Sequence, residues 1–431
     1  MKKTYILATV SIYAIVFAWV FVKNLAADTD YPYHLHAVWA VNQGHLLRDP
    51  FLNRGNSFTL AYGAPAYLLG GVLYPLFGIY TVALLLFLAL LLLWFGLRRM
   101  FGSGPDTHTT ALLCLLNPLT AYFFLTVKLP FLWGAALATL SLAMYREGRR
   151  LPAVGLGLLA VITHPLSLVL LAAVLLMKFE LHKWLSFYLP VCLVTLLQFL
   201  FLFGGGGGGT GPSPLFLHNL LMLLGSLLLL FLLKPQSRVP VLLALSLTGM
   251  ALILGFPSSC YFDRFAWAVL TVSMPFILLH LRSIRSPLPF LLLFCILPFL
   301  AVGATAVTAY PDNPEVYENL IAKNVVMAEL REGYVRYSGD GSALYFLPLA
   351  GVRLSNSGAL PFEMRLENDP LLFCKRMAEE NASFVLVYSE SPEENYLLQL
   401  NFPLFYSQEK LRIYKVPQWV GRVGDFGPAG F

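Results

Sequence analysis

Residues 66–99 read AYLLGGVLYPLFGIYTVALLLFLALLLLWFGLRR, a largely apolar run that ends in a pair of arginines. An α-helix needs about 20 apolar residues to cross a hydrocarbon core of about 30 Å, so this run is long enough to span a membrane. Over the whole chain of 431 residues, 58% are hydrophobic and 12% are charged. Soluble proteins carry about 25% charged residues. The composition therefore indicates a membrane protein and excludes an ordinary soluble enzyme, a disordered chain and a nucleic-acid-binding protein.

Further apolar runs of spanning length occur along the first three quarters of the chain. They cover residues 4–22, 108–126, 129–145, 184–203, 215–233, 239–256, 263–281 and 287–308. Residues 151–177 are also apolar, but Thr163-His164-Pro165 interrupts them at the midpoint, and proline has no N–H for the helical ladder. The sequence predicts a polytopic all-α membrane protein with about 11 helical passes or half-passes.

The charge balance divides the chain in two. Residues 1–308 hold 18 Lys+Arg and 7 Asp+Glu, whereas residues 309–431 hold 11 and 16. The first part is predicted to be the transmembrane domain, and the second has a composition that folds in water. In this second part, β-rich runs, apolar periodicity and turn residues predict a small α/β domain. Its expected strands are 334–337 and 343–347, then 383–388 and a hairpin over 405–416, and its expected helices are 314–332 and 370–381.

The distribution of Lys and Arg predicts the orientation of the chain. Alternate loops hold 13 and 5 of these cations, and cation-rich loops are typically cytoplasmic. This assignment places the N-terminus in the cytoplasm and residues 309–431 outside the cell membrane. It requires residues 151–177 to turn back near His164-Pro165 as two short helices. A single kinked span is the alternative.

The first outer loop contains a dense polar stretch, Asp28-Thr29-Asp30-Tyr31-Pro32-Tyr33-His34-Leu35-His36. Acidic groups beside a membrane are costly unless they are used or solvated. Asp28 and Asp30 are therefore the candidate catalytic residues, as a general base or as ligands of a metal ion. The structural alternative makes Asp30 the N-cap of a helix with Pro32 in its first turn and with Leu35 and Val38 on the membrane surface.

Other polar residues at the outer boundary are candidates for substrate binding. Arg264 suits bidentate binding of a phosphate at the membrane interface, although an arginine there also extends to lipid headgroups without any substrate. His164 lies at the apex of the proposed turn, where a lone histidine is more often structural. The full predicted set is His34, His36, Arg48, Asp49, Lys128, His164, Asp263 and Arg264.

In their order, these features resemble the membrane glycosyltransferases of the GT-C fold. The closest local likeness is to the first outer loop of archaeal oligosaccharyltransferase catalytic subunits. There an aspartate precedes a Tyr-His stretch, and an Asp-Pro-Phe turn follows before the second span. The residues Asp28, Asp30, Tyr33, His34, Asp49, Pro50 and Phe51 match that order.

The resemblance implies an inverting transfer of a sugar from a polyprenyl-phosphate-linked donor in the membrane lipid to an acceptor on the outer face. Asp28 or Asp30 would take the proton of the acceptor hydroxyl, and Arg264 or a divalent cation, Mg²⁺ or Mn²⁺, would stabilise the leaving phosphate. The C-terminal part has Trp419 as its one tryptophan and lacks the Trp-Trp-Asp motif of oligosaccharyltransferases. We therefore expect an acceptor other than an asparagine sequon.

Two other functional classes are compatible with the sequence. A transporter or lipid flippase would use the polar loop as a gate, and a non-catalytic scaffold would use its outer domain to bind a partner. Transporters usually show internal repeats and charged residues at mid-membrane. In this chain the predicted spans are nearly free of acidic residues, which favours the transferase.

Overall fold

The structure is a computed structural model, and it describes the following parts of the chain. They are residues 30–52, 59, 63–102, 107–115, 120, 123–124, 126–177, 180–201, 264, 267–268, 271–272, 274–275, 329–338, 346–349, 351–355, 370–408 and 411–423.

The chain divides into two compact units. The first, called here the helical unit, is assembled from Met1–Val22, Ala61–Leu69 and Tyr80–Tyr310. The second, called here the sheet unit, is assembled from Lys23–Leu60, Gly70–Ile79 and Pro311–Phe431. The first loop of the chain therefore belongs to the same compact unit as its C-terminal part.

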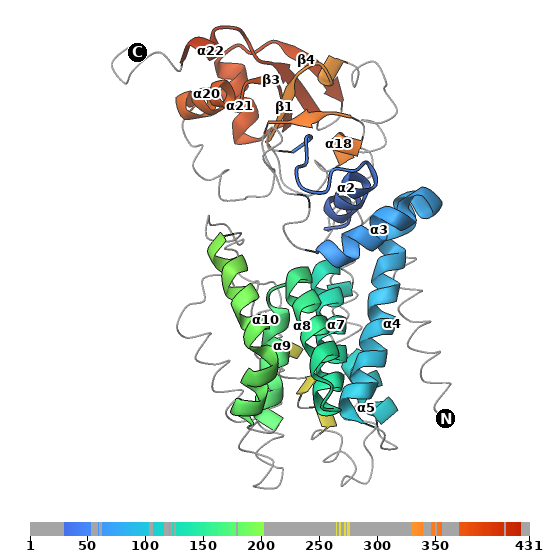
Figure 1. Cartoon of the computed structure of the whole chain (residues 1–431). Helices are drawn as coiled ribbons and strands as arrows, with labels where there is room; N and C mark the ends of the chain where they lie inside the picture. The colour runs from blue at the N-terminus through green and yellow to red at the C-terminus, as the bar shows by residue number, and fades with distance from the viewer. Residues whose placement is uncertain are drawn as a thin grey trace, which may run out of the picture. The chain divides into compact units, whose positions relative to one another are not determined.

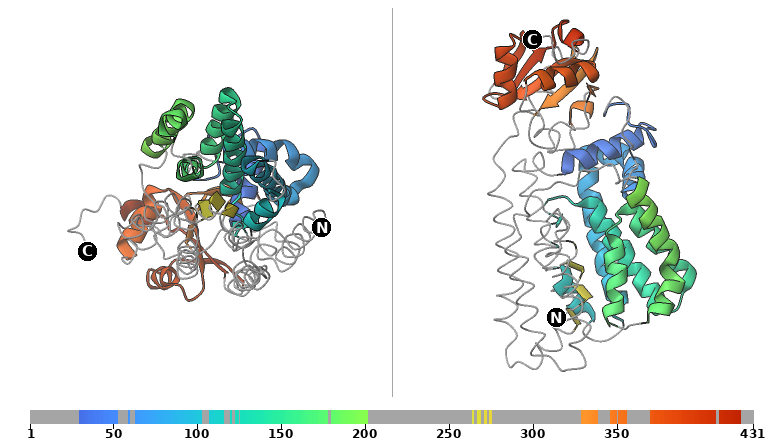
Figure 2. Two further views of the ribbon diagram at one scale, coloured as in Figure 1. Left: turned by 90° about the horizontal axis from the view of Figure 1, so that it is seen from below. Right: turned by 90° about the vertical axis from the view of Figure 1, so that its left-hand side faces the viewer.

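The described helices of the helical unit run side by side (Figures 1 and 2). They are α4 (Thr81–Phe101), α5 (Thr107–Leu115), α7 (Leu129–Arg146), α8 (Arg150–Thr163), α9 (Ser167–Met177) and α10 (Leu181–Phe201). Helix α7 is the central one, since it packs against α4, α8 and α9 and buries sixteen of its eighteen residues. The α4–α7 contact is close because Gly96 has no side chain: a Cβ there would lie 2.1 Å from the Thr139 hydroxyl.

Helices α8 and α9 are separated at His164-Pro165, and the chain turns back there. Helix α8 begins next to the end of α7, whereas α9 leads into α10, whose first turn returns to the same end of α7. Two contacts show this return: the Lys183 ammonium lies 5.0 Å from the Tyr145 ring centre, and the Phe187 ring centre lies 5.0 Å from that of Tyr145. The predicted turn within residues 151–177 is confirmed.

The polytopic all-α architecture predicted from the sequence is wrong. In the described residues, one helical segment, Ala64–Phe101, is long and apolar enough to cross a membrane, and the chain also contains a five-stranded sheet. The segment comprises α3 (Ala64–Phe77), a 3-10 turn (Gly78–Tyr80) and α4. It supports a membrane location, but within the described ranges no multi-pass arrangement is shown.

The error has a physical cause, because an apolar sequence is typical of a buried core helix as well as of a membrane span. Helices α5, α8 and α9 have nine, fourteen and eleven residues, which is shorter than the about 20 that a crossing needs. Helix α7 uses its apolar residues for contacts with other helices. The predicted spans 4–22, 215–233, 239–256 and 287–308 lie outside the described residues.

The sheet unit is built on five strands in the order β2-β1-β3-β5-β4. The strands are β1 (Tyr334–Ser338), β2 (Arg353–Leu354), β3 (Ala382–Tyr388), β4 (Leu404–Gln408) and β5 (Leu411–Lys415). Strand β1 pairs in parallel with β2 and β3, and β5 pairs antiparallel with β3 and β4. The helices are α2 (Tyr31–Asn42), α18 (Phe346–Leu349), α20 (Pro370–Glu379), α21 (Pro392–Gln399) and α22 (Val420–Val423).

Most of the predicted α/β elements in this region are confirmed. The strands near 334–337 and 383–388, the helix at 370–381 and the terminal hairpin are all present. The end of the predicted strand 343–347 is wrong, because Phe346 and Leu347 belong to the short helix α18, and residues 343–345 lie outside the described residues. The predicted helix 314–332 lies almost entirely outside the described residues.

The sheet buries both of its faces, and the side chains of β3 alternate between them. Phe384 and Leu386 join one apolar cluster, whereas Val385 and Val387 join the other together with residues of α20 and α21. This double burial explains why β3 reads as a nearly continuous apolar run.

The first loop completes one of these faces. Leu52, which is 5% exposed, joins the cluster of Phe384 and Leu386, and Tyr33 of α2 packs against the same cluster. Next to it, the Leu354 amide of the edge strand β2 donates to the Phe51 carbonyl at 2.8 Å. The loop therefore covers both an apolar face and an edge of the sheet, and an uncovered edge would expose unpaired backbone groups.

Leu52→Ala should destabilise the sheet unit. Truncating a buried leucine removes apolar contacts and leaves a cavity, which costs about 2–5 kcal/mol. The measurement is thermal unfolding of the purified full-length protein, together with hydrogen exchange at β1 and β2.

The matched control is Leu47→Ala, since Leu47 lies in the same loop but is 75% exposed. This change should alter the free energy of unfolding by no more than about 0.5 kcal/mol. Equal effects of the two substitutions would show that the loop is not part of the sheet core.

Candidate functional site

Asp30 stands at the N-cap position of α2, directly before the helical residues. The Asp30 carbonyl accepts a hydrogen bond from the His34 amide at 3.0 Å, and Pro32 lies in the first turn, where its missing N–H is not needed. The Asp30 side chain makes no capping hydrogen bond. The position predicted by the capping interpretation is thus confirmed, but the carboxylate is not used for capping.

A buried histidine–aspartate pair joins α2 to the loop that follows it. The His36 Nε2 lies 2.5 Å from an oxygen of Asp49, and the side chains are 1% and 3% exposed. The second carboxylate oxygen of Asp49 accepts from the Phe51 amide at 2.9 Å. Asp49 therefore fixes both His36 and the turn that presents Phe51 and Leu52 to the sheet.

The environment of Asp49 favours its ionised form. Burial alone would raise the pKa of this carboxyl group, but the hydrogen bond from His36, the charge of His36 and the hydrogen bond from the Phe51 amide outweigh it. The pKa of Asp49 is therefore lowered below its ordinary value of 3.8. A charged, hydrogen-bonded carboxylate at this position stabilises the fold of the loop.

Aromatic rings surround this pair. The Trp39 ring lies 5.6 Å from His36 and 5.1 Å from Phe51, measured between ring centres. Leu35 and Val38 of α2 are also buried, so their predicted place on the membrane surface is wrong. The apolar side of α2 packs against protein, which holds the helix start and Asp30 in a defined position.

A second group of predicted residues meets in the helical unit around one aromatic ring. The Arg264 guanidinium carbon lies 5.6 Å from the centre of the Phe131 ring, and the His164 ring centre lies 5.4 Å from it. The Phe131 ring also contacts Trp267 at 5.6 Å, and the Trp267 indole donates to the Thr120 hydroxyl at 2.8 Å. Arg264 and His164, which are 100 positions apart in the sequence, therefore share one aromatic neighbour.

The backbone sets the tautomer of His164. Its Nδ1 accepts a hydrogen bond from the Leu166 amide at 3.3 Å, in the turn between α8 and α9. In a neutral imidazole with Nδ1 as acceptor, Nε2 carries the hydrogen and is a donor. His164 and Arg264 thus present N–H donors near the start of α7.

Lys128 lies at this same helix start. It directly precedes Leu129, the first residue of α7, and its backbone amide donates to the Phe123 carbonyl at 2.8 Å. The Phe123 ring in turn contacts Phe131, with ring centres 4.7 Å apart. The structure therefore brings the cations Lys128 and Arg264 to one region with the neutral His164, and these three residues are called here the cationic group.

The remaining predicted residues have different environments. His34 is buried in α2, and Arg48 is exposed in the loop that precedes Asp49. Asp28 and Asp263 lie outside the described residues. Within the described ranges, no group of three His, Cys, Asp or Glu side chains could hold a metal ion. Of the two predicted ligands of Mg²⁺ or Mn²⁺, Asp28 and Asp30, only Asp30 is described. No step is assigned to a metal ion here.

The sequence analysis did not predict the aromatic residues that lie beside the cationic group. Phe131 and Trp267 are both buried; Phe131 contacts the predicted residues His164 and Arg264, and Trp267 contacts Phe131. The spacing of Trp267, three positions after Arg264, was a usable signal, since such residues neighbour each other on a helix. Phe131 carries no comparable signal because the chain has 33 phenylalanines.

No protein-family model matches the chain, and no curated protein is significantly similar to it in sequence.

Asp49→Asn should lower the free energy of unfolding by about 1.5–3 kcal/mol near neutral pH, because it removes a buried, charge-assisted hydrogen bond. Since the pKa of Asp49 is depressed in the folded state, its contribution is fully present above the unfolded-state pKa. It is lost as pH falls through the folded-state pKa.

Chemical denaturation of the parent and the variant, repeated from neutral pH to about pH 3, measures this difference. The gap between the two proteins should narrow at the acid end. A gap that is independent of pH would contradict an ionised Asp49 in the folded protein.

Proposed function

We propose that the chain is a glycosyltransferase of the cell membrane that uses a polyprenyl-phosphate-linked sugar as its donor. The proposal includes a cytoplasmic N-terminus, with the first loop and the C-terminal part on the outer side. The observation that carries it is the cationic group, in which Arg264 and His164 share the Phe131 ring. Apolar residues around donors of this kind suit a ligand that joins a phosphate to a hydrocarbon chain.

The chemistry of Arg264 favours a phosphate. A guanidinium offers donors in a planar fork that matches two phosphate oxygens, and stacking on an aromatic ring fixes the plane of the fork. His164 adds a donor at Nε2, and Lys128 adds an ammonium group. Together they would neutralise the charge that develops on a departing polyprenyl phosphate.

Asp30 is the proposed general base. Its carboxylate accepts the proton of an acceptor hydroxyl while that oxygen forms a bond to the anomeric carbon of the sugar. The bond from the anomeric carbon to the phosphate oxygen breaks in the same step, and the electron pair leaves with the phosphate. This single displacement inverts the configuration at the anomeric carbon.

Arg264→Ala should weaken the use of a polyprenyl-phosphate-linked sugar. Loss of a charge-assisted contact to the donor phosphate costs about 1.5–3 kcal/mol. This cost corresponds to a decrease of roughly tenfold or more in kcat/KM. The measurement is kcat/KM for the lipid donor with the purified full-length protein.

The control is Arg353→Ala, which removes an exposed arginine of strand β2. It should leave kcat/KM unchanged. Equal losses in the two variants would mean that Arg264 has no specific contact with the donor.

Asp30→Asn should lower the transfer rate by about 10²–10⁴, the contribution of a general base. Thermal stability should stay unchanged, because asparagine suits the N-cap position as well as aspartate does. The measurement combines a transfer assay with thermal unfolding. Transfer at the parent rate by a folded Asp30→Asn protein would exclude Asp30 as the base.

A further inference from the structure

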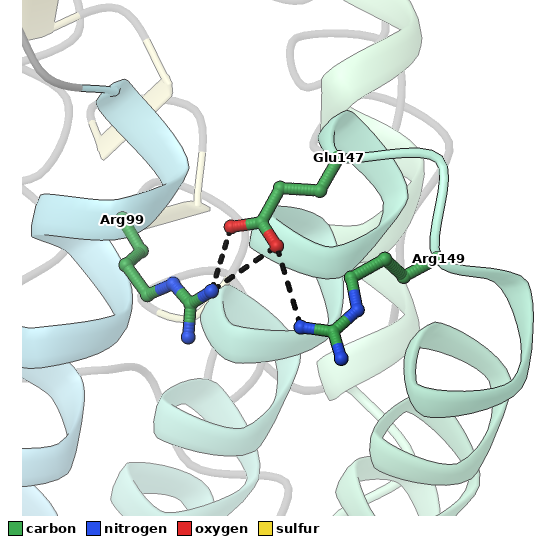
Figure 3. A network of polar contacts seen from close by, with 3 residues as sticks. All are labelled: Arg99, Glu147 and Arg149. Atoms are coloured by element: carbon green, nitrogen blue, oxygen red, sulfur yellow. Dashed lines mark hydrogen bonds and ion pairs between the residues drawn. The ribbon is translucent and has the colours of Figure 1, made fainter.

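A group of arginines lies where α4 and α7 end and α8 begins, and it is called here the arginine cluster. Its members are Arg98, Arg99, Arg146, Arg149 and Arg150. Figure 3 shows its ion pairs: Arg99 Nη2 lies 2.7 and 3.1 Å from the two oxygens of Glu147, and Arg149 Nη1 lies 3.8 Å from one of them. Arg146 donates to the Met100 carbonyl at 3.0 Å, which joins the ends of α4 and α7.

The cluster carries a surplus of positive charge. Five guanidinium groups stand against the one carboxylate, Glu147, that the described ion pairs place among them. The carboxylate and its two arginine partners are each more than one third exposed. A surface pair of this kind contributes little to stability, so it does not by itself explain the cluster.

Helix stabilisation explains only part of the arrangement. Arg98, Arg99 and Arg146 stand in the last turns of α4 and α7, where the helix dipole favours cations. Arg149 and Arg150 stand at the start of α8, where the same dipole disfavours them. The two α8 arginines therefore indicate an anionic partner.

Exposed apolar side chains adjoin the cluster. On α4, Leu91 and Phe95 are exposed on the turns before Arg98, and the Arg98 guanidinium lies 5.9 Å from the Trp94 ring centre. On α8, Leu151 follows Arg150 directly and is 86% exposed. A ligand that covers both surfaces needs a hydrocarbon part for the leucines and an anionic end for the arginines.

We propose that the arginine cluster binds the headgroup of an anionic phospholipid, whose acyl chains cover the apolar side chains of α4 and α8. A phosphate group accepts from arginine in bidentate geometry, and basic residues at a membrane surface attract anionic lipids. In the orientation proposed above, the positive-inside rule puts these arginines on the cytoplasmic side, where such lipids are abundant. This lipid site is independent of the proposed sugar transfer.

The test uses the full-length protein reconstituted in phosphatidylcholine, with spin-labelled phosphatidylglycerol or phosphatidylcholine as the probe. Electron paramagnetic resonance measures the relative association of each labelled lipid with the protein. The parent should prefer phosphatidylglycerol, and Arg98→Gln/Arg149→Gln/Arg150→Gln should reduce this preference by about a hundredfold, since each of the three arginines contributes about fivefold. Glu147→Gln should increase the preference, because it removes the negative charge inside the cluster.

The matched control is Arg353→Gln/Lys375→Gln/Lys415→Gln, which removes three exposed cations from the sheet unit. It should retain the parent's preference for phosphatidylglycerol. The proposal is overturned if the arginine variant and the control behave alike. It is also overturned if the parent shows no lipid preference but binds a soluble polyanion, such as heparin, through the same three arginines.

Discussion

The buried contact between the first loop and the C-terminal sheet is the constraint on which the sheet unit depends. The short helix α18 cannot cover its side of the sheet alone, and Leu52 and Tyr33 supply the missing apolar surface. The hydrogen bond between His36 and Asp49 fixes the turn that places Leu52 against the sheet. His36 belongs to α2, and Asp30 stands at the start of this helix. The position of Asp30 therefore depends on the folding of the C-terminal sheet, against which Leu52 packs.

The helical unit combines a packed interior with polar groups at defined places. Helix α7 is buried on almost all sides, and at its start the Phe131 ring contacts both Arg264 and His164. At its other end lie Glu147 and the arginine cluster. The two ends of α7 therefore carry different chemistry: donors beside an aromatic ring, suited to a phosphate, at the first, and exposed cations, suited to lipid headgroups, at the second.

The sequence predicted local elements better than architecture. Proline and turn residues located the α8–α9 turn, and alternating or continuous β-rich runs located β1, β3 and the terminal hairpin, because these signals act over a few residues. Apolar content alone does not distinguish a helix that faces lipid from one that faces protein, so the all-α multi-pass prediction failed. The pairing of His36 with Asp49 and the convergence of Arg264 on Phe131 depend on tertiary contacts that no local pattern encodes.

Release of polyprenyl phosphate is the most direct sign of the proposed sugar transfer. The purified protein would be incubated with a total lipid extract of the organism that makes it, with and without a cell-wall or membrane acceptor fraction, and the lipids followed by mass spectrometry. Our account predicts that one polyprenyl-phosphate-linked sugar disappears and free polyprenyl phosphate appears only when the acceptor is present. The acceptor fraction must first be shown to receive sugar when it is incubated with whole membranes. If the polyprenyl lipids then remain unchanged with the purified protein, the proposed sugar transfer is contradicted.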